Sequence, residues 1–242
     1  VPILLVDKPD DILVVCFGTG QTTGAAGLHP RVKTVDSVEL SSSVINAGKM
    51  FADQNHNVLA NPKVNFVIQD GRNHLLTTHK LYDVITSEPP PPRTAFTVNL
   101  YTREYYELQK SKLKPGGIAA QWIPLHSQGP KEVAMHFKTF QSVFPFTMGW
   151  LSVANEMLII GSIQPIKIDF NKLNERVQEP EIKKALENIE IPNIYSFLSN
   201  IWLLNEQVEK LGEGFPLITD NHPAIEFYLN LGKVIGVPGQ ER

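Results

Sequence analysis

The sequence predicts an α/β fold, in which a mostly parallel sheet carries helices on both faces and a helical appendage follows at the C-terminus. Over the first 160 residues, short apolar runs alternate with amphipathic segments. The first apolar run ends in a glycine-rich turn at residues 18–24, and the composition becomes more polar after Gly161. Strands that alternate with helices favour a parallel sheet. A chain of 242 residues suffices for one large domain, or for a main domain with a smaller unit.

Seven apolar runs predict the strands of this sheet. Five of them are rich in β-branched residues and predict parallel strands at residues 12–17, 32–39, 63–69, 82–87 and 117–123. The last two, at residues 146–153 and 157–163, predict a closing antiparallel pair with Asn155 near its turn.

The segments between the strands predict helices at residues 22–28, 42–51, 72–77, 102–113 and 128–144. In the last of these, Phe137, Phe140 and Phe144 recur at helical spacing, and we expect them in the core. Residues 171–211 continue as a polar helical pattern that is broken at Pro180 and Pro192. We therefore expect a main domain over residues 1–163 and a helical appendage over residues 164–242 that packs on it.

Composition excludes several classes of function. The net charge is −3 and no basic run exceeds two residues, which argues against a general nucleic-acid binder. Cys16 is the only cysteine, so disulfides and thiolate zinc sites are excluded, and we expect it to be a buried small hydrophobe. The seven histidines lack metal-ligand spacing, which predicts no metal site. No run of 18 apolar residues and no signal peptide occurs, so we expect this segment to be a soluble, cytoplasmic domain.

The ends of the first three predicted strands carry residues suited to an adenosyl ligand. Open α/β sheets bind ligands at the carboxyl ends of their strands. The first strand ends in Gly18, Thr19 and Gly20, which allow a close approach of the backbone beside a helix N-terminus. A tight turn without a ligand is the alternative interpretation of these glycines.

Acidic residues follow the next two strands. Glu39 can accept hydrogen bonds from both ribose hydroxyls, and Asp70, followed by Gly71, can accept one from an adenine amino group. Each acid alone is also compatible with a solvated loop. Because three consecutive strand ends carry suitable groups, we predict a site for S-adenosylmethionine or a close relative of it.

The fourth strand ends at Glu88, which four prolines follow at residues 89–92. Prolines stiffen the loop and remove amide donors. In this architecture the position faces the reacting end of the ligand, so Glu88 could serve as a general base or hold a substrate ammonium. The alternative is a rigid loop in which Glu88 pairs with Arg93 or Arg103.

Several longer strings extend this pattern over residues 11–161. They are C-F-G-T-G (16–20), V-E-L (38–40), Q-D-G-R-N (69–73), Y-D-V-I (82–85), S-E-P (87–89), Y-T-R-E-Y-Y (101–106) and Q-W (121–122). With them the chain resembles the spermidine synthase family of aminopropyltransferases. The tail strings L-I-T-D-N-H-P (217–223) and I-E-F (225–227) resemble bacterial spermidine-synthase-like domains that are fused to membrane-spanning segments.

This resemblance implies a Rossmann-like class I methyltransferase or aminopropyltransferase fold. Glu39 and Asp70 match the ribose-binding and adenine-binding acids, and Glu88 aligns with the catalytic aspartate. We expect S-adenosylmethionine or its decarboxylated form as co-substrate, and a small amine as acceptor. The substrate pocket is expected at Tyr105, Gln121 and Trp122, although Tyr105 and its neighbour Tyr106 fit helix packing equally well. The resemblance also leads us to expect a longer, membrane-anchored parent protein and a possible homodimer.

Three departures from the family pattern qualify this expectation. Thr19 replaces an aspartate that contacts the ammonium tail of the donor, and Pro91 replaces the second aspartate after the fourth strand. The small N-terminal β-rich domain of the family is almost absent. Since a buried ammonium without a carboxylate is costly, we expect poor binding of a diamine. Asp220 or Glu226 from the tail could compensate.

Three functions therefore remain open. The leading one is aminopropyl transfer to an amine, in which Glu88 removes a proton and methylthioadenosine leaves. The second is a methyltransferase that uses intact S-adenosylmethionine, because Thr19 does not repel the ligand's carboxylate and Glu88-Pro89-Pro90 is similar to a motif of amino-methyltransferases. The third is a non-catalytic sensor or partner-binding domain that has kept the nucleotide pocket.

Overall fold

Five parallel strands form one half of the central sheet in the order β3-β2-β1-β4-β5. The computed structural model of the chain describes residues 1–125, 128–151 and 156–227. The strands are β1 (Asp11–Val15), β2 (Thr34–Glu39), β3 (Val64–Ile68), β4 (Tyr82–Ser87) and β5 (Leu113–Pro124). The chain order reverses between β1 and β4, and a sheet of this kind binds its ligand at such a switch point.

Antiparallel strands complete the sheet in the order β5-β7-β6-β8. Their bounds are β6 (Phe146–Leu151), β7 (Glu156–Ser162) and β8 (Ile201–Leu203). Because β7 runs antiparallel to β5, its first residue, Glu156, pairs with Pro124 at the carboxyl end of β5. The predicted α/β fold and the closing antiparallel pair are confirmed, while Asn155 lies outside the described residues.

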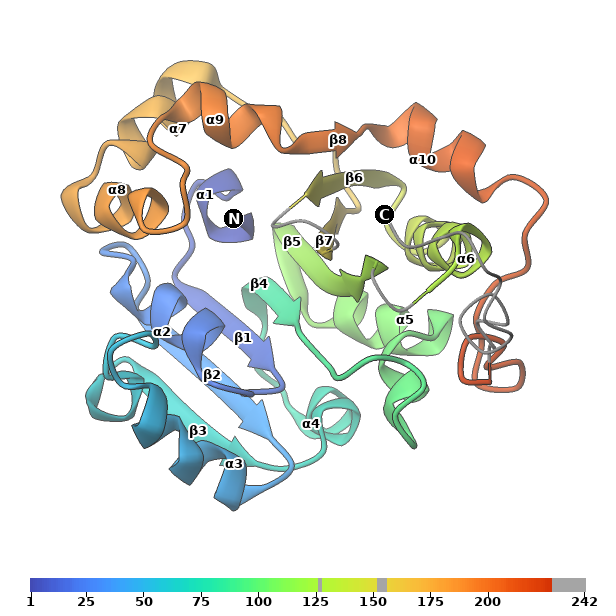
Figure 1. Cartoon of the computed structure of the whole chain (residues 1–242), viewed down its shortest axis with the longest axis horizontal. Coiled ribbons are helices and arrows are strands. Elements are labelled where there is room, and N and C mark those ends of the chain that lie inside the picture. The colour runs from blue at the N-terminus through green and yellow to red at the C-terminus, as the bar shows by residue number, and fades with distance from the viewer. Residues whose placement is uncertain (126–127, 152–155, 228–242) are drawn as a thin grey trace, which may run out of the picture.

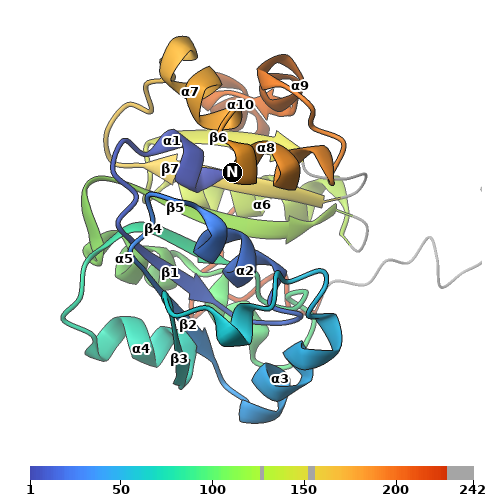
Figure 2. The ribbon, with the colours of Figure 1, turned by 90° about the vertical axis from the view of Figure 1, so that its left-hand side faces the viewer.

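Helices cover both faces of the sheet, because successive strand residues point to opposite faces. Ile12 and Val14 pack on one face under α1 (Pro2–Leu5), α2 (Gln21–Leu28), α7 (Phe170–Val177), α8 (Pro180–Glu187) and α9 (Ile194–Ser199). Leu13 and Val15 pack on the other face under α4 (Gly71–Thr77), α5 (Arg103–Ser111), α6 (Pro130–Gln141) and α10 (Asn205–Gly212). Figure 1 shows α1 beside α8, and Figure 2 shows α7, α8 and α9 at the end of the molecule away from α3 (Ser42–Ala47).

The predicted element bounds need correction in several places. β1 ends at Val15 because Cys16 takes a left-handed conformation with φ 71°. The helix expected at residues 42–51 is α3 followed by a 3-10 turn, η1 (Gly48–Phe51). Further 3-10 turns, η2 (Val58–Ala60) and η3 (Thr97–Leu100), lie in loops. As expected, Phe137, Phe140 and Phe144 are fully buried in the core.

The expected helices are present in the C-terminal segment, which also contains one short strand. β8 lies inside it and pairs with β6 through Gly149 and Trp150, because its backbone takes up the free edge of the main sheet. The helical pattern breaks at Pro180 as expected: α7 ends at Val177, and Pro180 begins α8, as its missing amide permits. The division into residues 1–163 and 164–242 stays a prediction.

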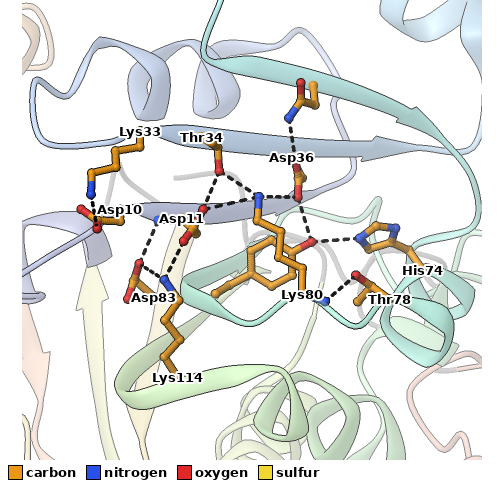
Figure 3. A network of polar contacts seen from close by, with 12 residues as sticks. Asp10, Asp11, Lys33, Thr34, Asp36, His74, Thr78, Lys80, Asp83 and Lys114 are labelled. Atoms are coloured by element: carbon orange, nitrogen blue, oxygen red, sulfur yellow. Dashed lines mark hydrogen bonds and ion pairs between the residues drawn. The ribbon is translucent and has the colours of Figure 1, made fainter.

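A network of ion pairs joins the amino ends of the parallel strands (Figure 3). Lys114 Nζ lies 2.6 Å from Asp11 Oδ2 and 2.8 Å from Asp83 Oδ2. Lys80 Nζ lies 2.9 Å from Asp36 Oδ2, which also accepts a hydrogen bond from the Tyr82 hydroxyl at 2.9 Å. The network ties the start of β1 to β2, β4 and β5, so the opposite, carboxyl edge is left free for binding. In the described part of the chain, no helix has the length and apolar character needed to cross a membrane.

Candidate functional site

A cavity of about 870 Å³ opens at the carboxyl edge of β1, β2, β3 and β4, at the switch point of the sheet. Its walls include residues at the carboxyl ends of all four strands, namely Gly18, Glu39, Asp70 and Glu88. The expected convergence of these four positions is therefore present. Backbone bonds hold the strand ends in register, since the Glu88 amide donates to the Val15 carbonyl at 3.1 Å. The volume is in the range of sites for small molecules, about 300–1,000 Å³.

Glu39 is oriented by two backbone amides. The Phe17 amide donates to Oε2 and the Ser41 amide donates to Oε1, both at 3.0 Å. A carboxylate oxygen has more than one acceptor position, so each oxygen keeps a site for a further donor such as a ribose hydroxyl. The two amides fix the rotamer and point the carboxylate into the cavity that it lines.

Asp70 combines a structural role with its place in the cavity. Its Oδ1 accepts a 2.8 Å hydrogen bond from the Asn73 amide, which caps the N-terminus of α4. Its Oδ2 accepts no hydrogen bond from the described part of the chain. This second oxygen can accept a hydrogen bond from a ligand amino group, so capping and ligand binding do not exclude one another.

The three glycines expected at the ligand differ in what they do. Gly18 has φ 55° and no neighbour within 4 Å of the position of a Cβ atom, so it borders open space in the cavity. Gly71 also lines the cavity, and its missing side chain makes room for Val15, whose Cγ1 would lie 2.4 Å from a Cβ atom. Gly20 is absent from the cavity wall, and a Cβ atom there would lie 2.4 Å from the Phe17 ring. Its assignment to the ligand is therefore corrected to a packing role at the start of α2.

Glu88 lies at the end of the cavity away from β3, and Thr22 is its partner. The Thr22 hydroxyl donates a 2.6 Å hydrogen bond to Glu88 Oε1. Burial raises the pKa of the Glu88 carboxyl, the hydrogen bond from Thr22 opposes this shift, and the negative charge of Glu156 adds to it. A carboxylate with a raised pKa is a stronger base, which suits the acceptance of a proton.

Glu156 is a second carboxylate at this end, and no residue pattern in the sequence had singled it out. It begins β7, lines the cavity together with Trp122, and interacts electrostatically with Glu88. Trp122 was expected in the substrate pocket, and the structure places it in this wall. The tail acids proposed as compensation do not lie here, since neither Asp220 nor Glu226 is among the lining residues.

Tyr105 and Gln121 are corrected from pocket residues to core residues. Both are fully buried and absent from the cavity wall. The Tyr105 hydroxyl lies 2.7 Å from Ser87 Oγ, inside the helix-covered core under β4. Gln121 precedes Trp122 on β5, so the two side chains point to opposite faces and only one of them can reach the cavity.

Cys16 lies on the wall of the cavity instead of being a fully buried hydrophobe. Burial, together with the negative charges of Glu39, Asp70 and Glu88, raises the pKa of its thiol to about 12. Since the thiolate is the nucleophilic form, this thiol is unreactive at neutral pH. The carboxylates of Glu39, Asp70 and Glu88 are thus all close enough to Cys16 to affect its pKa.

Residues beyond the predicted set close the end of the cavity at Asp70. Arg72 forms an ion pair with Asp220, whose backbone amide donates a 3.0 Å hydrogen bond to the Glu104 carboxylate. The tail string 217–223 is thereby attached to the cavity wall. Phe96 also lines the cavity, with φ 65° and a side chain that is 83% exposed, and no residue pattern had singled it out.

The chemistry of the cavity fits an adenosyl sulfonium ligand. It offers an open glycine, two oriented carboxylates and an acidic end at Glu88 and Glu156. Within residues 1–125, 128–151 and 156–227, no group of three or more His, Cys, Asp or Glu side chains could hold a metal ion.

Comparison with protein families gives a match to the spermine/spermidine synthase domain over residues 1–150. The polyamine aminopropyltransferase of Methanocaldococcus jannaschii is 27% identical over 78% of this chain and 67% of its own length. That of Bacillus cereus is 30% identical over 61% of this chain and 53% of its own length. The chain thus spans about half to two thirds of the length of these relatives.

Solved structures share the fold at lower identity. A spermidine synthase in complex with the transition-state analogue AdoDATO has a TM-score of 0.68 and 20% identity, over 87% of this chain and 71% of its own. Human methyltransferase-like protein 13 in complex with SAH has a TM-score of 0.58 and 20% identity, over 77% of this chain and 86% of its own. Both show the Rossmann-like fold shared by methyltransferases and aminopropyltransferases.

Proposed function

The chain belongs to the spermine/spermidine synthase family, and from this premise we propose that it transfers an aminopropyl group from decarboxylated S-adenosylmethionine to a small amine. Glu39 holds the ribose, Asp70 holds the adenine, the turn at Gly18 lets the backbone approach the ligand closely, and the sulfonium faces Glu88. The relatives are longer than this chain, so this activity is a proposal that rests on the residues present.

The acidic end of the cavity carries the proposal. Decarboxylated S-adenosylmethionine has a positive sulfonium and a positive ammonium, whereas the intact form adds a carboxylate. Glu88 and Glu156 lie at that end, and the one cation among the described lining residues, Arg72, is paired with Asp220. An ammonium finds a partner there, while a carboxylate meets like charges without a counterion, which costs several kcal/mol. Glu156 thereby supplies the negative charge that Thr19 lacks.

The transfer itself needs a base and correct alignment. A free alkylamine has a pKa of about 10.4, so it is protonated at neutral pH and must lose a proton before it can attack. Glu88, whose pKa is raised by burial, accepts that proton. The amine lone pair forms the new bond to the methylene carbon beside sulfur, the carbon–sulfur pair passes to sulfur, and neutral methylthioadenosine leaves. Alignment of the two reactants supplies most of the remaining rate enhancement.

A methyltransferase that uses intact S-adenosylmethionine is the second candidate. Thr19, exposed on the cavity wall, is the observation that favours it, because a threonine tolerates the carboxylate of the intact ligand. Glu156 argues in the other direction. A nucleotide-binding domain without chemistry is the third candidate.

Calorimetry with S-adenosylmethionine, its decarboxylated form and methylthioadenosine distinguishes these candidates. We expect the decarboxylated ligand to bind at least about tenfold more tightly than the intact one, which corresponds to about 1.4 kcal/mol. Glu156→Gln should narrow that preference, whereas the control Glu187→Gln, on the exposed side of α8, should leave it unchanged. Tighter binding of the intact ligand would support the methyltransferase. Binding of methylthioadenosine without turnover of any amine would support the non-catalytic domain.

Two finer expectations about the parent protein remain proposals. The likeness to members fused to membrane-spanning segments is tested by sequencing the reading frame on both sides of this chain. A homodimer is tested by analytical ultracentrifugation of the purified protein.

A further inference from the structure

One wall of the ligand cavity is a loop with little regular structure of its own. This loop wall, residues 89–100, follows Glu88, and the structure describes all of it, with η3 as its one helical turn. The cavity is lined by its residues Pro89, Pro90, Ala95, Phe96, Thr97, Asn99 and Leu100. Since residues 93–96 are exposed, contacts with other segments must hold the loop wall in position.

A segment of the C-terminal tail, residues 217–225, packs against the loop wall, and we call it the tail strap. The two segments share a hydrophobic cluster that consists of Val98, Tyr101, Met135, Ile218 and Ile225. Both isoleucines are fully buried there. The Tyr101 hydroxyl lies 3.2 Å from the Pro89 carbonyl oxygen, at the start of the loop wall. The cluster therefore connects the tail strap to both ends of the loop wall.

Hydrogen bonds fix the beginning of the tail strap on two helices. The Ile218 amide donates to the Thr139 hydroxyl of α6 at 2.9 Å. The Ile218 carbonyl oxygen accepts a 2.9 Å bond from the Arg103 amide at the start of α5. The tail strap is thus attached to the main domain before it reaches the cavity.

Asp220 extends this attachment into the cavity wall. Its two carboxylate oxygens pair with the two terminal nitrogens of Arg72, with a distance of 2.7 Å between Oδ1 and Nη1. Arg72 lines the cavity from α4, and its Nη1 also donates to the Asn99 carbonyl oxygen of the loop wall at 3.3 Å. One guanidinium therefore joins α4, the loop wall and the tail strap.

The geometry of this ion pair makes it stronger than an ordinary surface pair. The side chains of Arg72 and Asp220 are 24% and 35% exposed, so water screens the pair only in part. A bidentate contact between a guanidinium and a carboxylate also fixes the orientation of both groups. Loss of the Asp220 charge should therefore loosen the loop wall.

We propose that Asp220 is a positioning residue: through Arg72, the tail strap holds the loop wall in the place where the adenosyl ligand meets it. The inference rests on the proposed function, because it takes this cavity to be the adenosyl site. A wall that is already ordered removes part of the entropic cost of binding. The tail strap thereby contributes to affinity, although neither Asp220 nor its neighbours in the strap line the cavity.

Trypsin tests the position of the loop wall without any ligand. Arg93 is an exposed cleavage site inside it, and cleavage there requires the segment to open locally. When opening is fast, the cleavage rate follows the population of the open form. We expect Asp220→Asn to yield the fragment of residues 1–93 at least about fivefold faster than the wild type, since couplings between sites are typically about 5–150-fold.

Calorimetry with methylthioadenosine tests the consequence for binding. This ligand is neutral, so the lost charge at Asp220 has little direct electrostatic effect on it. Asp220→Asn should weaken its binding by about fivefold or more. Arg72→Lys keeps the positive charge and loses the bidentate pair, and its effect should be smaller in the Asp220→Asn background than in the wild type.

Glu179→Gln is the matched control for a loss of stability alone. It breaks the pair of Arg31 with Glu179, which also joins segments 148 residues apart and does not line the cavity. Both the cleavage rate after Arg93 and the affinity should stay at their wild-type values. If Asp220→Asn matches the wild type in either measurement, the inference is overturned. Failure of methylthioadenosine to bind the wild type would refute the proposed function, and the cleavage rates would still decide the role of Asp220.

Discussion

The Thr22 hydroxyl donates a 2.6 Å hydrogen bond to Glu88 Oε1 in the wall of the ligand cavity. Thr22 is in the first turn of α2, whereas Glu88 follows β4, so one hydrogen bond links the glycine-rich turn to the proposed base. The bond also opposes the effect of burial on the Glu88 pKa. It therefore tunes both the position and the basicity of this carboxylate.

Thr22→Val should raise the pKa of Glu88, because valine keeps the shape of the side chain and removes the donor. The acidic limb of the pH profile, for amine turnover or for affinity toward the decarboxylated ligand, should move to higher pH. Thr22→Ser keeps a hydroxyl and should restore the wild-type profile. An unchanged limb in Thr22→Val, measured by calorimetry from pH 5 to 8, would show that the hydrogen bond does not control Glu88.

Asp70→Asn should weaken methylthioadenosine binding by about 1–3 kcal/mol. Asn caps a helix about as well as Asp, so the bond from the Asn73 amide is kept while a donor replaces the free carboxylate oxygen. Asp169→Asn is the matched control, because Asp169 caps α7 through the Lys172 amide and does not line the ligand cavity. If the two variants bind methylthioadenosine with equal affinity, Asp70 does not contact the ligand.

Gly18→Ala and Gly20→Ala should separate binding from packing. Both glycines have positive φ, which costs alanine roughly 1–2 kcal/mol. At Gly20 a methyl group would also meet the Phe17 ring at 2.4 Å and Val58 at 3.1 Å. That ring is fixed edge-on against Phe66, so we expect a further loss of about 1–3 kcal/mol.

Denaturant unfolding and calorimetry on the same samples check this pair. Gly18→Ala should stay folded and lose affinity for methylthioadenosine, because its methyl group enters the cavity. Gly20→Ala should mainly lower the free energy of unfolding. If Gly20→Ala mainly loses affinity and Gly18→Ala mainly loses stability, Gly20, and not Gly18, lies at the ligand.

Much of the sheet and three site residues could be predicted from sequence because parallel topology fixes where strand ends meet. The bounds of β4 coincide with the predicted residues 82–87, and Glu39, Asp70 and Glu88 follow their strands into one cavity. Glu156 was missed because it begins an antiparallel strand, whose amino end lies at the same edge. The acidic residue at the start of the predicted antiparallel strand β7 was the feature of the sequence that could have identified it.

Other misses have local physical causes. Tyr105 belongs to one of the strings that resemble the family, yet its position on α5 directs its side chain into the core. β8 has three residues between two helices, too few for a periodic pattern to be recognised. Gly20 shares a string with Gly18, and only the packed position of the Phe17 ring distinguishes their roles.

The last prediction concerns His136, whose burial makes stability depend on pH. The imidazole is fully buried on α6, with Nε2 2.8 Å from Gln128 Oε1 and its ring edge-on to Tyr101. Burial lowers its pKa to about 3. Between pH 6.5 and that value the unfolded chain binds a proton that the folded chain does not. The free energy of unfolding must therefore fall as the pH falls, by up to about 1.4 kcal/mol per pH unit for one histidine.

His29, with its pKa lowered to about 4, should add to this slope over the upper part of the same range. Urea unfolding between pH 7.5 and 5 measures the sum, and His136→Gln isolates one contribution. At pH 7.5 both proteins are uncharged at this position, so their difference there reports the change in packing alone. Below pH 6.5 the variant, which cannot bind the proton, should lose stability less steeply than the wild type. Parallel pH dependences of the two proteins would show that the imidazole of His136 is protonated in the folded state or exposed to water.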